Sequence, residues 1–278
     1  MMDHRNHFNL LDECFPGIKA NIVRTEKIGF PWVSKPFLKE ERGEVLSHVG
    51  VLEYPMLVEG RLIKAAALHA ICTKSPNRGK GLASELIKKV IEWAKGRYEL
   101  LVLFTEIPAF YEKLSFKLLQ EYRFHLRVNH SSGTKALRQI QSPADDRLFK
   151  EIFRNRASLS NRLWVRDNGV FASFNSLFAT YPDYWSLFYS DTLNGFISYH
   201  IEGKTLHLFD LVSNSIPSLD MILDHFYQEI EEVIFYFSPD RLSSDAEAKP
   251  YQYDNGYFMA YGNWPLSKPF MVSPLARC

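Results

Sequence analysis

The stretch Thr73–Leu86, TKSPNRGKGLASEL, separates an apolar run that ends at Cys72 from a strongly helical segment. It contains a proline, two glycines that flank Lys80, and no acidic residue before Glu85. A helix begins with several backbone N–H groups that have no intrahelical partner, at the positive end of its dipole. Because glycines let such a backbone approach a bulky anion closely, the stretch predicts a phosphate- or pyrophosphate-binding loop.

Two familiar phosphate-binding loops fit the stretch less well. A Walker loop requires the spacing G-x-x-x-x-G-K-S/T, which is missing here. A Rossmann turn requires G-x-G-x-x-G directly after a strand, whereas Gly79-Lys80-Gly81 has Ser84 at the third glycine position. An acid after the next predicted strand, Glu106, keeps a dinucleotide-binding alternative open. An ordinary capped loop is the other alternative.

The segments around the loop predict a mixed α/β domain. Two extended runs, 45–58 and 62–73, are joined by a short glycine-containing turn and predict a β-hairpin. Residues 82–94 repeat apolar side chains at helical spacing, and 98–104 is a continuous apolar run typical of a strand covered on both faces. Further segments predict a helix in 3–15, a loop in 29–44, a strand in 116–128, a helix in 145–159 and a strand in 163–174.

The second half of the chain repeats the order hairpin, helix, strand, in residues 195–212, 218–230 and 233–237. Its connecting loop, SNSIPS, has neither a glycine nor a basic residue. The polar residues 129–146 separate the halves. We therefore expect two domains, a catalytic one in 1–140 and a degenerate one without the anion loop in 141–278.

Composition and charge limit the kind of protein. Of 278 residues, 46 % are hydrophobic and 23 % charged, as in globular proteins with a well-filled core. A net charge of +1 gives no general attraction to nucleic acid or anionic membranes, so a positive site has to be local. The three cysteines, Cys14, Cys72 and Cys278, form neither a disulfide framework nor a paired metal motif, which indicates a reducing compartment.

The termini and the apolar runs bear on localisation. The N-terminal residues lack the apolar core of a signal peptide, and no run approaches the length needed to cross a bilayer. We therefore expect a cytoplasmic protein with no membrane or nucleic-acid partner and no metal site.

Residues Arg78–Ala83, RGKGLA, match the pattern Q/R-x-x-G-x-G/A of the GNAT family of N-acetyltransferases, which hold the pyrophosphate of acetyl-CoA at this place. The surrounding ICTKSPNRGKGLASEL resembles that family's strand–loop–helix core, and FYEKLSF resembles its Y-x-x-x-G-F element. The resemblance covers residues 44–120. More widely, YPMLVEG, LFTEIPAFYEKL and the second unit resemble the tandem-GNAT architecture of aminoglycoside-acetylating Eis-type proteins, whose additional sterol-carrier-like domain we expect to be absent.

The resemblance implies an N-acetyltransferase that moves the acetyl group of acetyl-CoA directly to a primary amine of a small molecule or peptide. Tyr111 matches the tyrosine that protonates the departing CoA sulfur. Two departures stand out: Ser115 replaces the expected glycine, and LFTEIP lacks a frequent asparagine. The implied coenzyme-binding residues are Ile71, Cys72 and Thr73 through their backbone, and Arg78, Gly79, Lys80, Gly81, Leu82 and Ala83.

The general base is left open by the sequence. Glu53, His48 and His69 lie on the predicted hairpin, and water is a further alternative because proximity of bound reactants lowers much of the barrier. In Eis-type proteins the terminal carboxylate reaches the active site, and by that analogy Cys278 supplies one here.

Acceptor binding is expected to use aromatic faces and carboxylates, which suit a cationic amine. The candidates are Trp32, Phe37, Tyr181, Asp183, Tyr184, Trp185 and Asp191. A non-catalytic acyl-CoA sensor or interaction protein is the alternative function.

Overall fold

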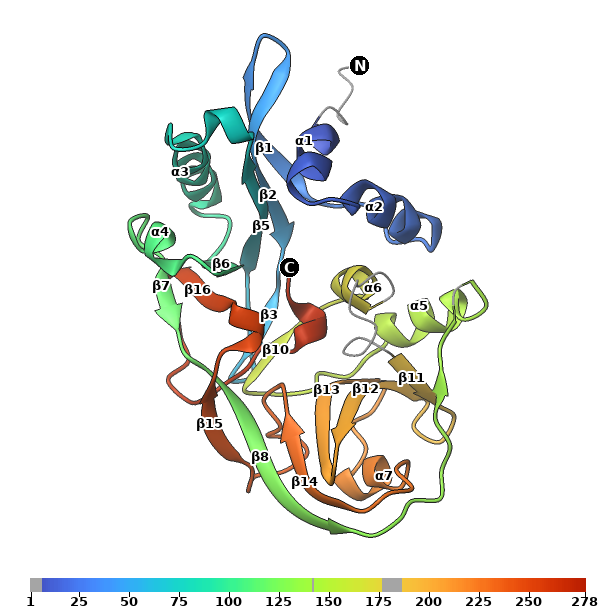
Figure 1. Cartoon of the computed structure of the whole chain (residues 1–278). Helices are drawn as coiled ribbons and strands as arrows, with labels where there is room; N and C mark the ends of the chain where they lie inside the picture. The colour runs from blue at the N-terminus through green and yellow to red at the C-terminus, as the bar shows by residue number, and fades with distance from the viewer. Residues whose placement is uncertain (1–6, 142, 177–186) are drawn as a thin grey trace.

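Two large β-sheets with surrounding helices form the molecule (Figure 1). The computed structural model describes residues 7–141, 143–176 and 187–278. The α-helices in these ranges are α1 (His7–Cys14), α2 (Ile18–Lys27), α3 (Leu82–Ala94), α4 (Pro108–Glu112), α5 (Asp146–Arg154), α6 (Val170–Ser176) and α7 (Leu219–Leu223). None of the helices in these ranges has the length and apolar character to cross a membrane.

The first sheet carries the hairpin and the strand that flank the glycine loop. Its strand order is β1 (Lys35–Glu41), β2 (Glu44–Glu53), β5 (Ala65–Thr73), β6 (Leu100–Thr105), β16 (Tyr257–Gly262) and β7 (Lys117–Leu119). Helix α3 covers one face of this sheet, and α1 lies on the other (Figure 1). The predicted helix after the loop is therefore confirmed.

The predicted hairpin continues into a small separate sheet. Strands β3 (Met56–Val58) and β4 (Arg61–Ile63) pair with each other, and β3 also pairs with β10 (Leu163–Val165). The turn between them places Glu59 and Gly60 at positive φ, as the sequence EGR suggested. This sheet links the two halves of the chain.

Two local predictions are corrected. Residues 29–44 were expected to form a loop, but β1 begins at Lys35, and Pro36 is accommodated because β1 is an edge strand that pairs only with β2. Residues 163–174 were expected to be one strand, but the strand ends at Val165. Buried Asp167 then accepts hydrogen bonds from the amides of Gly169, Phe171 and Ala172 and starts helix α6.

The second sheet contains the repeated unit. Its strand order is β15 (Glu247–Tyr251), β8 (Glu121–His130), β14 (Ile230–Phe235), β13 (Thr205–Ser213), β12 (Gly195–Glu202), β11 (Leu187–Ser190) and β9 (Arg138–Gln139). The hairpin β12–β13, helix α7 and parallel strand β14 follow the order of β2–β5, α3 and β6. The fold is thus a mixed α+β fold in which the second unit repeats the element order of the first, as the sequence predicted.

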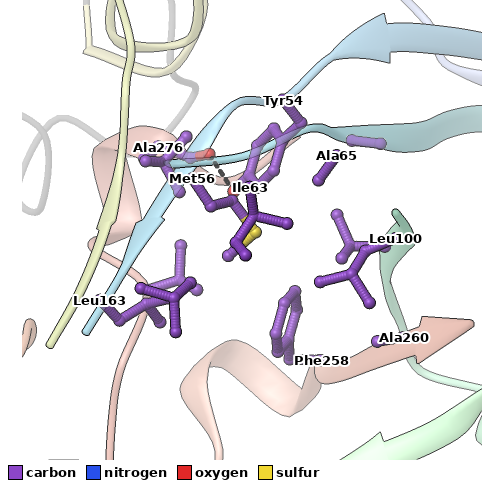
Figure 2. Close-up of a cluster of buried hydrophobic side chains, with 14 of the residues drawn as sticks. Tyr54, Met56, Ile63, Ala65, Leu100, Leu163, Phe258, Ala260 and Ala276 are labelled. Carbon is purple, nitrogen blue, oxygen red and sulfur yellow. Dashed lines mark hydrogen bonds between the residues drawn. The ribbon is translucent and has the colours of Figure 1, made fainter. Parts of the chain in front are cut away.

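The two sheets exchange strands. Strand β16, near the end of the sequence, lies between β6 and β7 in the first sheet, whereas β8 lies in the second (Figure 1). The domain boundary at residue 140 stays a prediction, because β8 and β9 from the first side lie in the second sheet and β16 from the other side lies in the first. Figure 2 shows a buried cluster at this junction, in which Tyr54 and Met56 from the hairpin meet Leu163, Phe258 and Ala276.

Candidate active site

A gap between β5 and β6 lies at the centre of the first sheet. The two strands run parallel but pair only at Ala65–Ala67 with Leu100–Val102. Further along, the pairing of β5 with β2 shifts register at Ala70, which has φ +48°, a left-handed conformation uncommon outside glycine. In the part of the chain that the structure describes, no strand pairs with the β6-facing edge of residues 68–73. Such a free edge suits an extended, hydrogen-bonding ligand.

His48 supports the bulge in β5. Its Nδ1 lies 2.8 Å from the carbonyl oxygen of Ala70, and burial lowers the pKa of His48 to about 4. The imidazole is therefore neutral near pH 7, and Nδ1–H donates to that carbonyl. His69 sits beside the bulge with its Nε2 2.7 Å from the Ser34 hydroxyl, and burial lowers its pKa to about 3. Both ring systems are neutral structural groups at physiological pH.

The glycine loop presents a row of backbone amides at the start of α3. Gly79 and Gly81 have φ of +77° and +79°, and a Cβ at either position would meet nothing within 4 Å. Gly81 is the N-cap of α3 and supplies no side-chain cap. Among the described residues, no protein acceptor takes a hydrogen bond from the amides of residues 79–84. Arg78 and Lys80 are exposed beside these amides, so the loop offers N–H donors and positive charge together.

The start of α7 in the second unit differs from the start of α3. The side chain of Ser218 accepts a hydrogen bond from the amide of Met221 at 3.2 Å. One of the free donors is therefore occupied by the chain itself. The start of α7 therefore differs from the uncapped start of α3, and the loss of the anion loop in the second unit stays a prediction.

Tyr111 lies on α4, which directly follows β6. Its ring packs against Phe110 and Phe116, and its hydroxyl forms a side-chain hydrogen bond with Thr105, the last residue of β6. Burial raises the pKa of Tyr111, and the hydrogen bond with Thr105 opposes that shift. The phenol is thus protonated at neutral pH and lies at the end of the strand gap.

Ser115 adopts the left-handed backbone conformation that favours the glycine expected at this position. Its φ is +67°, and the amide of Phe116 donates to the carbonyl oxygen of Tyr111 at 3.2 Å to close the turn. The departure from the family pattern has therefore not changed the turn that holds α4.

A cavity of about 490 Å³ opens beside the bulge, on the face of the sheet opposite α3. The N-terminal helices, the loop after α2, β5, α6 and the C-terminal residues form its walls. The side chains that define it include Phe15, Phe30, Trp32, Leu52, His69, Phe171, Arg277 and Cys278. Its volume is in the range of small-molecule pockets.

The C-terminal residues are held firmly at this cavity. The buried carboxylate of Glu121 accepts hydrogen bonds from the amide of Val272 at 3.0 Å and from the Arg277 guanidinium at 2.5 Å. Tyr54, fully buried, donates its hydroxyl to the carbonyl oxygen of Ala276 at 2.7 Å (Figure 2). These bonds place Cys278 at the cavity wall.

The same C-terminal segment fills the strand gap of the second unit. Strands β13 and β14 pair only from Thr205 to Leu208, and then diverge like β5 and β6. Ser273 lies where these two strands separate, and its hydroxyl donates a hydrogen bond to the Asp210 carboxylate at 2.5 Å. The same carboxylate forms an ion pair with the buried Arg156 guanidinium at 2.7 Å. The amide of Met271 donates to the Ser238 hydroxyl at 3.3 Å on the other side. The second gap is thus occupied by protein.

The structure does not bring every predicted residue to the cavity. Glu53 is exposed on the α3 side and accepts a hydrogen bond from Tyr98, so it lies on the opposite face. Phe37 packs against Trp93 on that same side, and Asp191 is exposed at a turn after β11. Trp32 does line the cavity. Tyr181, Asp183, Tyr184 and Trp185 lie outside the described residues.

Several site residues were not found from the sequence. Phe171, Glu121 and Arg277 reach the cavity or its wall through contacts between segments far apart in the chain. Only the DNG in Asp167–Gly169, a turn and helix-start signal, could have located α6 beforehand.

Comparisons with known proteins find a domain match in the first part of the chain. Residues 3–119 match the family model described as acetyltransferase (GNAT) domain. A search of curated proteins found no match.

Several solved structures share the fold. A conserved Enterococcus faecalis V583 protein, described as a probable N-acyltransferase, aligns over 94 % of this chain and 70 % of its own, with TM-score 0.60 and 12 % identity. A GCN5-related N-acetyltransferase from Kribbella flavida aligns over 92 % and 67 %, with TM-score 0.53 and 16 % identity. Eis1 from Mycobacterium abscessus aligns over 86 % and 71 %, with TM-score 0.53 and 13 % identity.

The family match spans the hairpin, the glycine loop, α3 and the tyrosine-bearing helix. Residues 3–119, less than half of the chain, are thus similar to the acetyltransferase (GNAT) domain, and the solved structures above show that the chain shares the fold of these proteins.

Proposed function

We propose that the first unit transfers an acetyl group from acetyl-CoA to a primary amine that binds in the cavity. The observation that carries the proposal is the row of amides in residues 79–84, which have no protein acceptor among the described residues and lie between exposed Arg78 and Lys80. A pyrophosphate supplies the acceptor oxygens that these donors lack. Leu82 and Ala83 contribute amides of the first helical turn.

The pantetheine arm would occupy the gap between β5 and β6. Ile71, Cys72 and Thr73 end β5 beyond the bulge, where its edge has no strand partner in the described chain. Main-chain atoms of these residues can therefore pair with the amides of the arm, as an added strand would. The thioester then lies near the end of β6, between Tyr111 and the cavity.

The reaction needs one proton removed from the amine and one delivered to sulfur. The amine nitrogen bonds to the acetyl carbon, the carbon–sulfur bond breaks, and Tyr111 gives its proton to the departing thiolate. We assign the α-carboxylate of Cys278 as the group that takes the amine proton, because Cys278 lines the cavity. This role requires that carboxylate to be free, which intact-mass measurement of the purified protein checks.

The other predicted bases fit less well. The low pKa values of His48 and His69, about 4 and about 3, make both rings weak proton acceptors at neutral pH. Glu53 is on the far face of the sheet, hydrogen-bonded to Tyr98. Cys278 is therefore preferred to Glu53 as the base.

The coenzyme site is tested by the double variant Gly79→Asp, Gly81→Asp. Carboxylates in the loop repel the pyrophosphate, so acetyl-CoA affinity measured by calorimetry should fall on the order of 100-fold. Gly43→Asp is a matched control, because Gly43 also has positive φ, +82°, and open space at Cβ, but lies in the β1–β2 turn. Affinity that survives the double change refutes the site.

Tyr111→Phe tests the proton donor. Turnover should fall about 10- to 100-fold while acetyl-CoA affinity stays within twofold, because only a proton is lost. Since burial raises the pKa of Tyr111, the wild-type rate should decline only at pH above the ordinary tyrosine range, and the variant should lack that decline. Unchanged turnover would remove Tyr111 from the mechanism.

The alternative function is that of a non-catalytic acyl-CoA sensor. Such a sensor would bind acetyl-CoA and turn over no amine.

A further inference from the structure

Apart from the α-carboxylate of Cys278 proposed above, the described groups that line the cavity next to the strand gap carry almost no charge. Among its described lining residues there is no aspartate or glutamate side chain, and the only charged side chain is Arg277, which is already paired with Glu121. His69 also lines the wall, and its pKa of about 3 keeps it neutral. The described lining residues therefore provide no acidic side chain for a second positive charge on a ligand.

Most of the polar side chains that line the cavity are hydrogen-bonded within the protein, and Asn21 is the exception among the described residues. The Thr25 hydroxyl donates to the carbonyl oxygen of Ile22 at 2.9 Å, and the Ser173 hydroxyl donates to that of Val170 at 2.8 Å. The Ser34 hydroxyl lies 2.7 Å from His69. What remains facing a ligand is mainly apolar.

Aromatic rings contribute most of that apolar surface, but they do not make the cavity a cation site. Phe15, Phe30, Trp32 and Phe171 line it. A cation over an aromatic face gains about 0.5–2 kcal/mol. Removing an ammonium group from water costs several kcal/mol unless a countercharge is present. The cost exceeds the gain, so a charged group on the ligand that has no countercharge is disfavoured there.

We infer that the acceptor is an apolar primary amine with a single amino group on an aromatic or aliphatic body, rather than a polyamine or an aminoglycoside. This inference rests on the proposed acetyl transfer and specifies its substrate class. The single amine reaches the base and reacts neutral, while its body fills the space between Trp32, Phe30 and Phe171. A volume of about 490 Å³ holds a compound of roughly 15 non-hydrogen atoms.

An isosteric pair of amines tests the inference with the full chain. Hexylamine and 1,5-diaminopentane have equal numbers of non-hydrogen atoms and differ only in a terminal methyl or amino group. With acetyl-CoA and a thiol-release assay, kcat/KM should favour hexylamine on the order of 100-fold, because the diamine buries a second ammonium without a partner. 2-Phenylethylamine should equal or exceed hexylamine. Equal or better use of the diamine overturns the inference.

A surface variant provides an internal check. Val33 lines the cavity and is 56 % exposed, so Val33→Glu adds a carboxylate at the cavity without disturbing the core. The preference for hexylamine over 1,5-diaminopentane should fall at least about threefold, since the added charge attracts the second ammonium. Val23→Glu is the control, because Val23 is 49 % exposed on α2 and is not a lining residue. The same change in both variants contradicts the assignment of the cavity.

Failure of this inference differs from failure of the proposed function. Acetylation of 1,5-diaminopentane or kanamycin in preference to hexylamine leaves acetyl transfer intact and overturns the substrate class. Absence of acetyl-CoA binding overturns the proposed function. If acetyl-CoA binds but no amine reacts, the binding of each amine is measured by quenching of tryptophan fluorescence. Stronger binding of hexylamine than of 1,5-diaminopentane supports the apolar substrate class. Equal or weaker binding of hexylamine overturns it.

Discussion

Single residues at the site hold backbone conformations that their side chains disfavour. Ala70 and Ser115 both have positive φ, at the bulge in β5 and at the turn after α4. A non-glycine residue there costs about 1 kcal/mol or more, and it persists because the surrounding structure fixes it. Ala70 shapes the strand gap, and Ser115 shapes the turn that follows the helix carrying Tyr111.

Ser115→Val should destabilise the protein by about 1–2 kcal/mol, because a β-branched side chain is excluded from the left-handed region. Ser115→Asn is the matched control, since asparagine adopts this region readily and should change stability by less than about 0.5 kcal/mol. Urea unfolding followed by tryptophan fluorescence measures both variants. Equal stability of the two would show that the turn at Ser115 relaxes.

His48 should make stability depend on pH. Its pKa is lowered to about 4 in the folded state, so its contribution is present above pH 6.5 and is lost as pH falls toward 4. Between pH 7 and pH 5, this contribution of His48 should fall by about 2 kcal/mol, and the free energy of unfolding of the wild type should fall with it. In His48→Gln, the free energy of unfolding should fall between the two pH values by about 2 kcal/mol less than it does in the wild type. His200→Gln, at an exposed histidine on β12, should behave like wild type.

At the scale of elements, the sequence predicted what is local and missed what is assembled from distant segments. The unit from β5 through the loop to α3 is continuous, and its glycines, basic residues and apolar spacing specify it directly. The turn at Glu59-Gly60 and the repeat in the second half were found for the same reason. The cavity was not found, because its walls come from α1, α2, β5, α6 and the C-terminal residues.

Glu53 illustrates the limit for catalytic residues. The sequence placed it on the correct strand, but strand residues alternate between two faces, and Leu52 rather than Glu53 faces the cavity. Nothing in the local pattern says which face holds the substrate. The pairing of Glu121 with Arg277, 156 residues apart, has no local signal at all.

Glu121→Gln should loosen the C-terminal segment. Arg277 would lose the carboxylate that neutralises it in a buried position, so stability should fall by about 3 kcal/mol. Release of the terminal residues by carboxypeptidase should become faster, and amine turnover should fall while acetyl-CoA affinity stays within twofold. In Glu121→Gln, Arg277→Met, part of the lost stability should return because no buried charge is left unpaired. Unchanged turnover with faster release would separate the segment from catalysis.

At the scale of the whole molecule, the exchange of strands makes the two units depend on each other. Strand β16 pairs with β6 along Leu100–Thr105 and with β7, so the first sheet is completed only when residues 257–262 are in place. Strand β8 in turn lies between β15 and β14 of the second sheet. Long-range pairing of this kind couples the stability of both sheets.

A fragment of residues 1–140 should not fold as a stable domain. Without β16, strand β6 would expose its hydrogen-bonding edge and the apolar residues that Phe258 and Met259 cover. We expect the fragment to aggregate or to unfold without a cooperative transition by circular dichroism, whereas the full chain unfolds cooperatively. A soluble fragment with a sharp transition would show that the first unit is self-sufficient.

The segment around Ser273 makes the second unit a receptor whose ligand is part of the same polypeptide. A tethered peptide is present at an effective concentration on the order of millimolar, so a free coenzyme entering that gap has to compete with a ligand that never diffuses away. Saturation with acetyl-CoA should accordingly stop at one equivalent per chain. The occupied gap serves instead as the anchor that keeps the last residues of the sequence at the cavity of the other unit.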